Sequence, residues 1–98
     1  MGGQITYEIA YTKAAEKFFK THEAVREEYE KAIRELLAGE HPETVDLKRI
    51  RGKKLNYYRI RLGMWRVVYT VVNGRIIVIH TILAGPRGDV YKKMDGLK

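Results

Sequence analysis

The stretch YYRIRLGMWRVVY, residues 57–69, restricts the fold most, because apolar and basic residues alternate on both sides of a central glycine. Such alternation is typical of β-strands with one buried face, and glycine at the first central position favours a two-residue hairpin turn. With Gly63 and Met64 as the turn, Leu62 pairs with Trp65 and each further pair lies one residue outward on both strands. This register predicts a hairpin with one apolar face and one basic face.

The basic face of this hairpin contains Arg59, Arg61 and Arg66, and the register sets Arg61 directly opposite Arg66. Like charges opposite each other in a sheet repel, at a cost of up to about 1 kcal/mol. Stability alone therefore does not favour this pair. We expect an anionic partner on this face.

A second hairpin is indicated by Asn73-Gly74, which is a strong short-range turn signal. If these two residues form the turn, the strand that follows spans residues 75–83. Arg66 then lies opposite Thr81, and His80 lies on the apolar face.

The N-terminal half predicts a strand over residues 5–11 and two helices, over 13–21 and 23–38. Thr12 is suited to cap the first helix, which buries one of its two adjacent phenylalanines, and Gly39 is suited to end the second. The expected fold class is α+β with the order β-α-α-β-β-β. A helical hairpin packs on one face of a small, mainly antiparallel sheet and leaves the basic face open to a ligand.

Length and composition limit the class of protein. We expect 98 residues to form a single domain, residues 1–98. The absence of cysteine excludes disulfides and fits a reducing cytoplasm. No apolar run approaches the roughly 18 residues of a membrane span, and the first residues lack the features of a signal peptide. These features predict a soluble cytoplasmic protein.

Charge is distributed unevenly along the chain. Residues 1–46 contain six Lys or Arg and ten Asp or Glu, a net charge of −4, whereas residues 47–98 contain thirteen and two, a net charge of +11. No acidic residue lies between Asp46 and Asp89. The basic residues of this interval are Lys48, Arg49, Arg51, Lys53, Lys54, Arg59, Arg61, Arg66, Arg75 and Arg87. A solvated surface normally mixes both signs, so this segregation favours a surface that binds a polyanion, with nucleic acid as the first candidate, over ordinary surface charge.

The sequence lacks the residues that several kinds of catalytic site require. No two histidines have the sequence spacing of metal ligands, and the chain has no cysteine, so no metal or cofactor is expected. The histidines are His22, His41 and His80. The basic half has no paired carboxylates for two-metal or glycosidase chemistry, and no glycine-rich phosphate loop. A reaction at the basic face would have to use Arg, Lys and Tyr.

From KRIRGKKLNYYRIRLGMWRVVYTVVNGRIIVI to the ending GPRGDVY, the sequence resembles the RelE/ParE family of toxins from toxin–antitoxin systems. The resemblance extends from Tyr7 to Tyr91 and is strongest for the RelE branch, the ribosome-dependent mRNA endoribonucleases. It rests on YRIRLGxxR, followed by a hairpin and GPRGxxY. It implies a compact toxin, as a monomer or in a hetero-oligomer with its antitoxin, that cleaves mRNA in the ribosomal A site. The implied partners are mRNA, the ribosome and a cognate antitoxin with an acidic amphipathic segment; no membrane is involved.

The resemblance also assigns roles to residues. Arg66 and Arg87 would hold the phosphate, Arg59 and Arg61 would bind flanking phosphates or polarise the attacking 2′-hydroxyl, and Tyr91 would stack on a base. The family often has lysine at the first two positions, and arginine cannot replace lysine as a general base because its pKa is above about 12. Five further basic residues are expected either to dock on the ribosome or to be solvated surface charge, and they are Lys48, Arg49, Arg51, Lys53 and Lys54.

Other interpretations stay open at this point. Arg87 is also suited to a turn, Tyr91 to packing on the sheet edge, Asp89 to a turn or helix cap, and Arg59 and Arg61 to simple contacts with ribosomal RNA. A ParE-like inhibitor of DNA gyrase would have the same fold and basic character without a nuclease site. A non-catalytic RNA-binding homologue is the third alternative.

Overall fold

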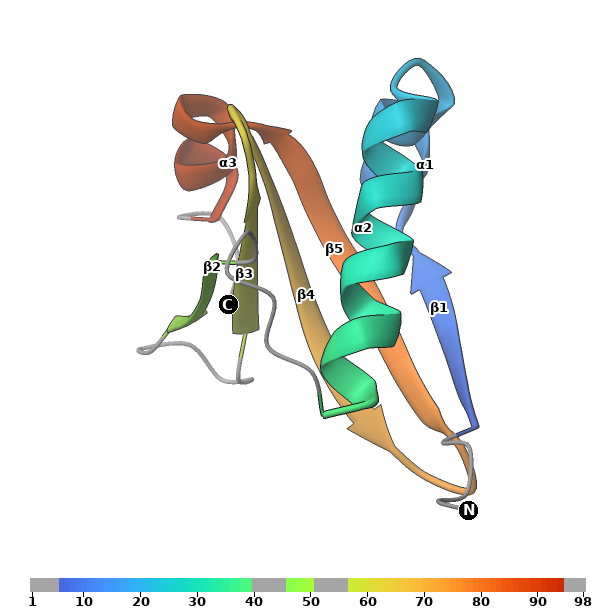
Figure 1. Ribbon diagram of the computed structural model, residues 1–98. Coiled ribbons are helices and arrows are strands. Elements are labelled where there is room, and N and C mark those ends of the chain that lie inside the picture. Colours follow the sequence, from blue (N-terminus) through green and yellow to red (C-terminus); the bar gives the residue numbers. More distant parts are fainter. Residues whose placement is uncertain (1–5, 40–45, 51–56, 95–98) are drawn as a thin grey trace.

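The computed structural model describes residues 6–39, 46–50 and 57–94 (Figure 1). The elements are β1 (Tyr7–Tyr11), α1 (Lys13–Lys20), α2 (Glu23–Leu37), β2 (Asp46–Ile50), β3 (Tyr57–Leu62), β4 (Trp65–Asn73), β5 (Ile77–Pro86) and α3 (Arg87–Met94). The five strands form one sheet in the order β1-β5-β4-β3-β2. Only β1 and β5 are parallel, and the other neighbouring pairs are antiparallel.

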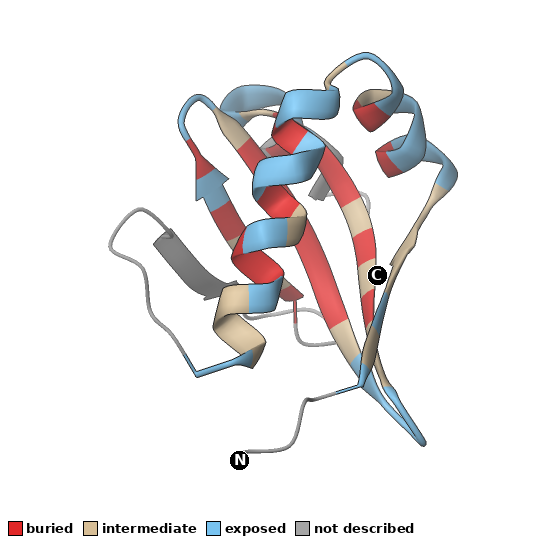
Figure 2. Ribbon diagram, turned by 45° about the vertical axis from the view of Figure 1, so that its right-hand side comes forward, coloured by how far each residue is buried: buried red, intermediate tan, exposed pale blue. Residues whose placement is uncertain are grey.

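Helices α1 and α2 cover one face of the sheet and turn their buried residues toward it (Figure 2). This arrangement confirms the predicted α+β class, with a helical hairpin on a small, mainly antiparallel sheet. Strand β2 and helix α3 were not part of the predicted element order. Both lie in the basic half of the chain, where charge obscures the apolar periodicity on which a sequence prediction depends.

The start of α1 is capped as predicted. The hydroxyl of Thr12 accepts a hydrogen bond from the backbone N–H of Ala15 at 3.2 Å and donates one to the carbonyl of Ile82 at 2.6 Å. The same side chain therefore caps the helix and attaches it to β5. Of the two adjacent phenylalanines, Phe19 is buried and Phe18 is half-buried.

Helix α2 ends where its sequence indicates. Gly39 follows the last turn with a φ of +83°, the left-handed conformation that glycine adopts without strain. The buried residues of this helix lie at helical spacing and face the sheet. They are Val25, Tyr29, Ala32 and Ile33.

The hairpin of β3 and β4 has the predicted register. Leu62 pairs with Trp65, and the ladder continues outward to Tyr57 opposite Thr70. Gly63 has a φ of +61°, and no described residue other than glycine has a positive φ. Positive φ at the first central position alone is the requirement of a type II′ turn, so glycine is needed at Gly63 but not at Met64.

The predicted register of the second hairpin is wrong. The connection has three residues, Gly74 to Ile76, and the first pair is Asn73 with Ile77. A bulge then shifts the register again, because Tyr69 pairs with Thr81 whereas Val68 pairs with Leu83.

This shift changes two predicted positions. Arg66 lies opposite Gly85 rather than Thr81. His80 pairs with Thr70 and lies on the face away from α1 and α2, because its neighbours Ile79 and Thr81 point to the helical side. The prediction that His80 faces the apolar side is therefore wrong.

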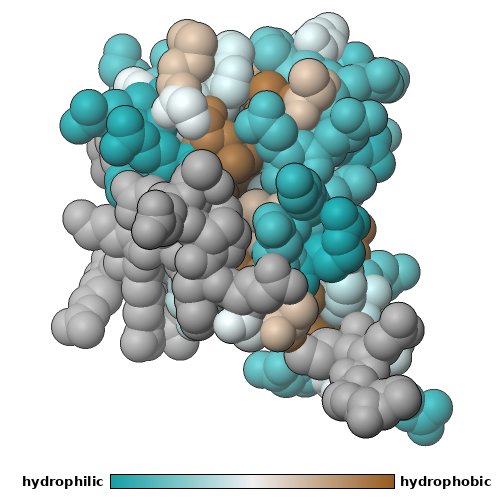
Figure 3. Space-filling model, in the orientation of Figure 1, coloured by the Kyte–Doolittle hydropathy of each residue, from teal (hydrophilic) through white to brown (hydrophobic). Residues whose placement is uncertain are grey.

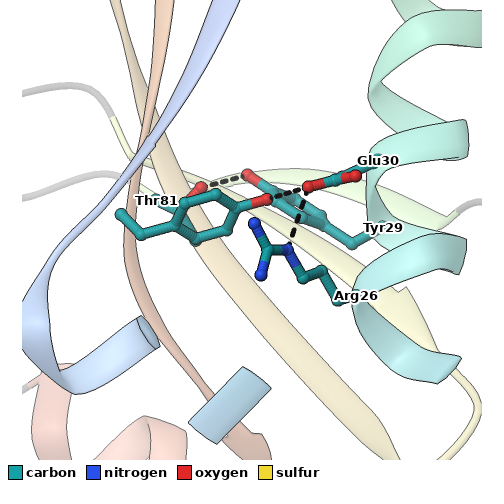
Figure 4. Close-up of polar contacts among 5 residues, drawn as sticks. Arg26, Tyr29, Glu30 and Thr81 are labelled. Atoms are coloured by element: carbon teal, nitrogen blue, oxygen red, sulfur yellow. Dashed lines mark hydrogen bonds and ion pairs between the residues drawn. The ribbon is translucent and has the colours of Figure 1, made fainter. Parts of the chain in front are cut away.

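The main core, between the helices and the sheet, contains a buried polar contact (Figure 4). The hydroxyls of Tyr29 and Thr81 lie 2.7 Å apart, and both residues are fully buried. Nearby, the hydroxyl of Tyr11 donates to Glu30 at 2.5 Å, and Arg26 Nε donates to the same carboxylate at 3.1 Å. These bonds connect β1, α2 and β5, so they fix the position of the helical layer on the sheet.

The buried tyrosines predict a loss of stability at alkaline pH. Burial raises the pKa of Tyr69 to about 12, and it also raises the pKa values of Tyr29 and Tyr11, the latter with a contribution from Glu30. An unfolded tyrosine has a pKa of about 10. The folded state therefore holds its phenolic protons where the unfolded state loses them, and stability that is fully present below pH 10 falls as pH rises toward 12.

For Tyr69 alone, this effect amounts to at most roughly 3 kcal/mol. The urea midpoint should stay constant from pH 8 to 9 and fall steadily between pH 10 and 12. The Tyr69→Phe variant should show a shallower fall. A midpoint that does not change up to pH 12 would contradict this explanation.

The opposite face of the sheet carries a second, smaller core. Tyr57, Val68 and Leu83 pack there against Val90 of α3, and Ile82 lies against them. Helix α3 thus covers part of the face that the sequence predicted to be open to a ligand. That prediction is wrong for this part of the face, because the apolar side chains between the arginines are buried under α3.

Candidate functional site

The arginine cluster, defined as Arg59, Arg61 and Arg66, lies on the α3 side of β3 and β4. Arg61 is exposed and stands opposite Arg66, as predicted, while Arg59 is half-buried. The neighbouring strand β2 places the backbone of Asp46 opposite Arg61 and that of Lys48 opposite Arg59.

Arg66 is the most buried residue of the cluster. Its side chain is 7% exposed, and its Nη1 donates to the carbonyls of Gly63 at 2.8 Å and Trp65 at 3.0 Å. Its Nε is buried and has no hydrogen-bond partner among the described residues. A buried charge is costly unless it is paired or hydrogen-bonded. The two backbone bonds hold the guanidinium at the hairpin turn and leave Nε as a donor without an acceptor.

The described residues provide no counter-charge for Arg66. Within residues 6–39 and 57–94, one ion pair is present, and it joins Arg26 and Glu30 on the helical side of the sheet. This pair is exposed, so it contributes at most about 1 kcal/mol. The charge of Arg66 is therefore not offset by an ion pair with a residue of these ranges.

Arg87 lies close to the cluster along the chain. Gly85 pairs with Arg66 and Pro86 pairs with Trp65, so β5 ends beside the turn of the first hairpin. Arg87 is the next residue, the exposed first residue of α3. The fold thus brings Arg66 and Arg87 to the same end of the sheet from positions 21 residues apart in the sequence.

The other predicted site residues are described less fully. Tyr91 belongs to α3, but its side chain lies outside the described part. The backbones of Lys48 and Arg49 lie in β2, an edge strand of the sheet, without described side chains. The remaining predicted ribosome-docking residues lie outside the described residues, and they are Arg51, Lys53 and Lys54.

Two features of this surface escaped the sequence prediction. The first is His80, which the corrected register places on the same face as the arginine cluster. The second is helix α3, which had a detectable signal: Pro86 precedes its first turn, Asp89 lies in that turn, and two lysines follow near its end. The shifted register of His80 had no such signal.

Other kinds of site are not found in the described ranges. No group of three or more His, Cys, Asp or Glu side chains lies close enough there to hold a metal ion. None of the described helices has the length and apolar character needed to cross a membrane.

Comparison with known proteins identifies the family. Residues 9–87 match the family model described as the ParE toxin of the type II toxin–antitoxin system parDE. No curated protein and no solved structure gave a significant match. The matched residues run from Ile9 within β1 to Arg87 at the start of α3, and they include the helical hairpin, strands β2 to β5 and the arginine cluster. The chain therefore belongs to the ParE toxin family, within the RelE/ParE superfamily of type II toxin–antitoxin systems.

Proposed function

We propose that this toxin is a metal-independent endoribonuclease that cleaves mRNA in the ribosomal A site. The observation that carries the proposal is Arg66, whose guanidinium is oriented by two backbone carbonyls and has no ion-pair partner among the described residues. A charge held in this way is already oriented, so it can bind a phosphate oxygen without a large loss of side-chain entropy.

RNA contains its own nucleophile, which explains how a site without metal can cleave it. The 2′-oxygen attacks the adjacent phosphorus, the bond from phosphorus to the 5′-oxygen breaks, and the products are a 2′,3′-cyclic phosphate and a 5′-hydroxyl. One proton leaves the 2′-hydroxyl and one reaches the departing 5′-oxygen. Negative charge develops on the non-bridging oxygens, where fixed guanidinium groups are most effective.

In this proposal each residue of the site has a separate role. Arg66 and Arg87 bind the scissile phosphate, because both lie at the end of the sheet where β5 joins α3. Arg59 and Arg61 bind flanking phosphates or polarise the 2′-hydroxyl. Tyr91 stacks on a base of the single-stranded message.

In the same proposal, the basic residues of β2 and of the segment after it bind the toxin to the ribosome. They add a sequence-independent attraction to ribosomal RNA that decreases with salt. These residues are Lys48, Arg49, Arg51, Lys53 and Lys54.

The proposal predicts that cleavage depends on the ribosome. The guanidinium groups of the cluster do not act as general bases. The reaction therefore needs the ribosome to hold the mRNA with the 2′-oxygen, the phosphorus and the leaving 5′-oxygen nearly in line. With programmed ribosomes, we expect cuts at the A-site codon, mapped by primer extension, at least about 100-fold faster than on naked mRNA. Equal cleavage of both substrates would refute this dependence.

A second candidate function is inhibition of DNA gyrase, which the match to a ParE toxin model favours. In that case the arginine cluster would bind a protein surface and the chain would not cut RNA. A supercoiling assay with purified gyrase distinguishes the two functions. Inhibition at a stoichiometric toxin concentration, together with intact mRNA on ribosomes, would establish the gyrase function; binding to ribosomes without either effect would indicate a non-catalytic RNA-binding homologue.

A further inference from the structure

A groove of about 380 Å³ lies between α1 and α3, beside the last residues of β5. Phe18 of α1 and Pro86 of β5 form part of its apolar lining. Its polar lining residues are Lys17, Thr21 and Asp89. Figure 3 shows apolar surface between α3 and the helical layer, with hydrophilic side chains on both sides. Pockets for small ligands have volumes of roughly 300 to 1,000 Å³, so the groove has room for one flat ring such as a nucleobase.

An ordered aromatic wall lies on the α1 side of the groove. Phe18 stacks on His22 with ring centroids 4.1 Å apart and meets Trp65 edge-on at 5.3 Å. The Nδ1 of His22 lies 2.9 Å from the carbonyl oxygen of Phe18 and donates to it, because a carbonyl oxygen only accepts. These contacts restrain the Phe18 ring before any ligand binds. Aromatic side chains at a surface stack on the unpaired bases of single-stranded RNA.

The polar residues of the groove favour one base over the others. Within residues 6–39 and 57–94, neither Lys17 nor Asp89 forms an ion pair. An ionised aspartate accepts two hydrogen bonds side by side, and a lysine only donates. Guanine presents two adjacent donors, N1–H and the 2-amino group, and two acceptors, O6 and N7. The other three bases each have one donor group on the edge where guanine has two, so a carboxylate binds them less well.

The groove adjoins the candidate phosphate site. Gly85 and Pro86 line it, and the exposed Arg87 follows them directly. Gly85 is also the strand partner of Arg66. Exposed lysines at spacings of four and three along α1 add attraction for a nucleic-acid backbone. These lysines are Lys13, Lys17 and Lys20. A base in the groove therefore has positive charge beside its own phosphates.

We propose that the groove between α1 and α3 binds one guanine of single-stranded RNA. The base lies against Phe18, its N1–H and 2-amino group donate to Asp89, and its O6 or N7 accepts from Lys17. The adjoining phosphate lies at Arg87. This inference rests on the proposed function, because it takes RNA as the ligand, and it adds a base preference that contacts to phosphate do not supply. Binding requires neither the ribosome nor cleavage, so it is measured by itself.

Trp65 is suited to report this binding, because it is the single tryptophan of the chain and its ring contacts Phe18. The probes are pentamers of 2′-O-methyluridine with guanine, adenine, cytosine or uracil as the central base, and they lack the 2′-hydroxyl that cleavage needs. We expect the fluorescence titration to give at least about fivefold tighter binding for the guanine probe than for each of the others. No binding, or equal dissociation constants for all probes, would overturn the proposal.

The Asp89→Asn variant distinguishes base recognition from general attraction. It removes a negative charge, so the uracil probe should bind slightly more tightly, but the guanine probe should bind at least about fivefold more weakly. Glu27→Gln removes an equal charge from an exposed position of α2 and should leave the guanine preference unchanged. A preference that persists in Asp89→Asn would reject the proposed contact and the proposal with it.

Lys17→Ala tests the groove from the α1 side, without a change in α3. We expect it to lower the guanine preference at least about threefold, whereas Lys31→Ala, at an exposed position of α2, should not lower it. Thermal melting should show that all variants are folded. Equal guanine preferences in the two lysine variants would contradict the assignment of the groove.

The base preference and the nuclease function fail in different ways. A guanine preference in a chain that leaves mRNA on ribosomes intact would support this inference and reject the nuclease function. Cleavage of mRNA by a chain that binds the guanine and uracil probes equally would reject this inference alone.

Discussion

The Arg66→Ala variant is expected to cleave A-site mRNA about 100- to 1,000-fold more slowly than the unaltered chain, as when one donor to a developing oxyanion is removed. Arg66 is 7% exposed and oriented by the carbonyls of Gly63 and Trp65, so its loss removes a fixed charge that a mobile surface residue cannot replace. Cleavage should be measured by primer extension at saturating ribosome concentration. The loss should therefore appear as a lower maximal rate.

Arg75→Ala is the matched control. Arg75 is exposed in the turn between β4 and β5, outside the arginine cluster, so its replacement removes the same charge elsewhere on the surface. Arg87→Ala should resemble Arg66→Ala, and the double variant should lose less than the product of the two effects, since both residues would serve one phosphate. Full cleavage and growth arrest by Arg66→Ala and Arg87→Ala would remove the nuclease function and favour gyrase inhibition.

Stability should be recorded alongside these assays. Removal of Arg66 ends its repulsion with Arg61 but also deletes its two bonds to the hairpin turn, so we expect the free energy of unfolding to change by no more than about 1 kcal/mol. A much larger loss of stability would mean that the cleavage defect of Arg66→Ala reports unfolding. In that case Arg87→Ala, at an exposed position, remains the decisive variant.

The largest effect on stability is expected for Phe19→Ala, at about 3 to 5 kcal/mol. Phe19 is 1% exposed and its ring stacks on Tyr29 at 5.8 Å and meets Tyr11 edge-on at 5.6 Å. Its removal would leave a cavity where α1, α2 and β1 meet. Small proteins have a total stability of roughly 5 to 15 kcal/mol, so this loss would remove about a third of the stability or more, and nearly all of it at the lower end of the range.

Phe18→Ala is the control for this prediction, because it deletes the same side chain one position away. Phe18 is half-buried and packs on His22 and Trp65 near the surface, so water can occupy the space that it leaves. We expect Phe18→Ala to cost clearly less in urea denaturation. Equal losses for the two variants would show that the main core is not centred on Phe19.

Much of the local structure could be predicted from the sequence because its causes are local. The register of the β3–β4 hairpin follows from strict alternation and a glycine in a two-residue turn, which allow only one pairing that buries a single face. The cap at Thr12 and the end of α2 at Gly39 depend on one residue each. Membership of the RelE/ParE superfamily could be predicted for the same reason, since the resemblance rested on this hairpin and on the ending GPRGDVY. The family model that matches is that of a ParE toxin, and the match ends at Arg87.

The candidate site was only partly predictable. Alternation placed Arg59, Arg61 and Arg66 on one face, but it contained no information on burial, and the structure shows that Arg66 differs from the other two. Its burial depends on the carbonyls of the hairpin turn and on the meeting of Gly85 with its strand. The carbonyls belong to residues one and three positions from Arg66, but the pairing with Gly85 joins residues 19 positions apart, beyond the reach of a local pattern.

The β4–β5 pairing shows most clearly what the sequence alone determined and what required the tertiary structure. The sequence determined that two strands follow each other near Asn73-Gly74, but a three-residue connection and a bulge at Ile82 decided which residues face the helices. The carbonyl of Ile82 accepts the hydroxyl of Thr12, a contact across 70 residues that no local propensity encodes. Each one-residue shift of a strand exchanges its two faces. The three-residue connection therefore places Thr81 in the core and His80 on the face of the arginines, and the bulge exchanges the faces again for Leu83 and the residues after it.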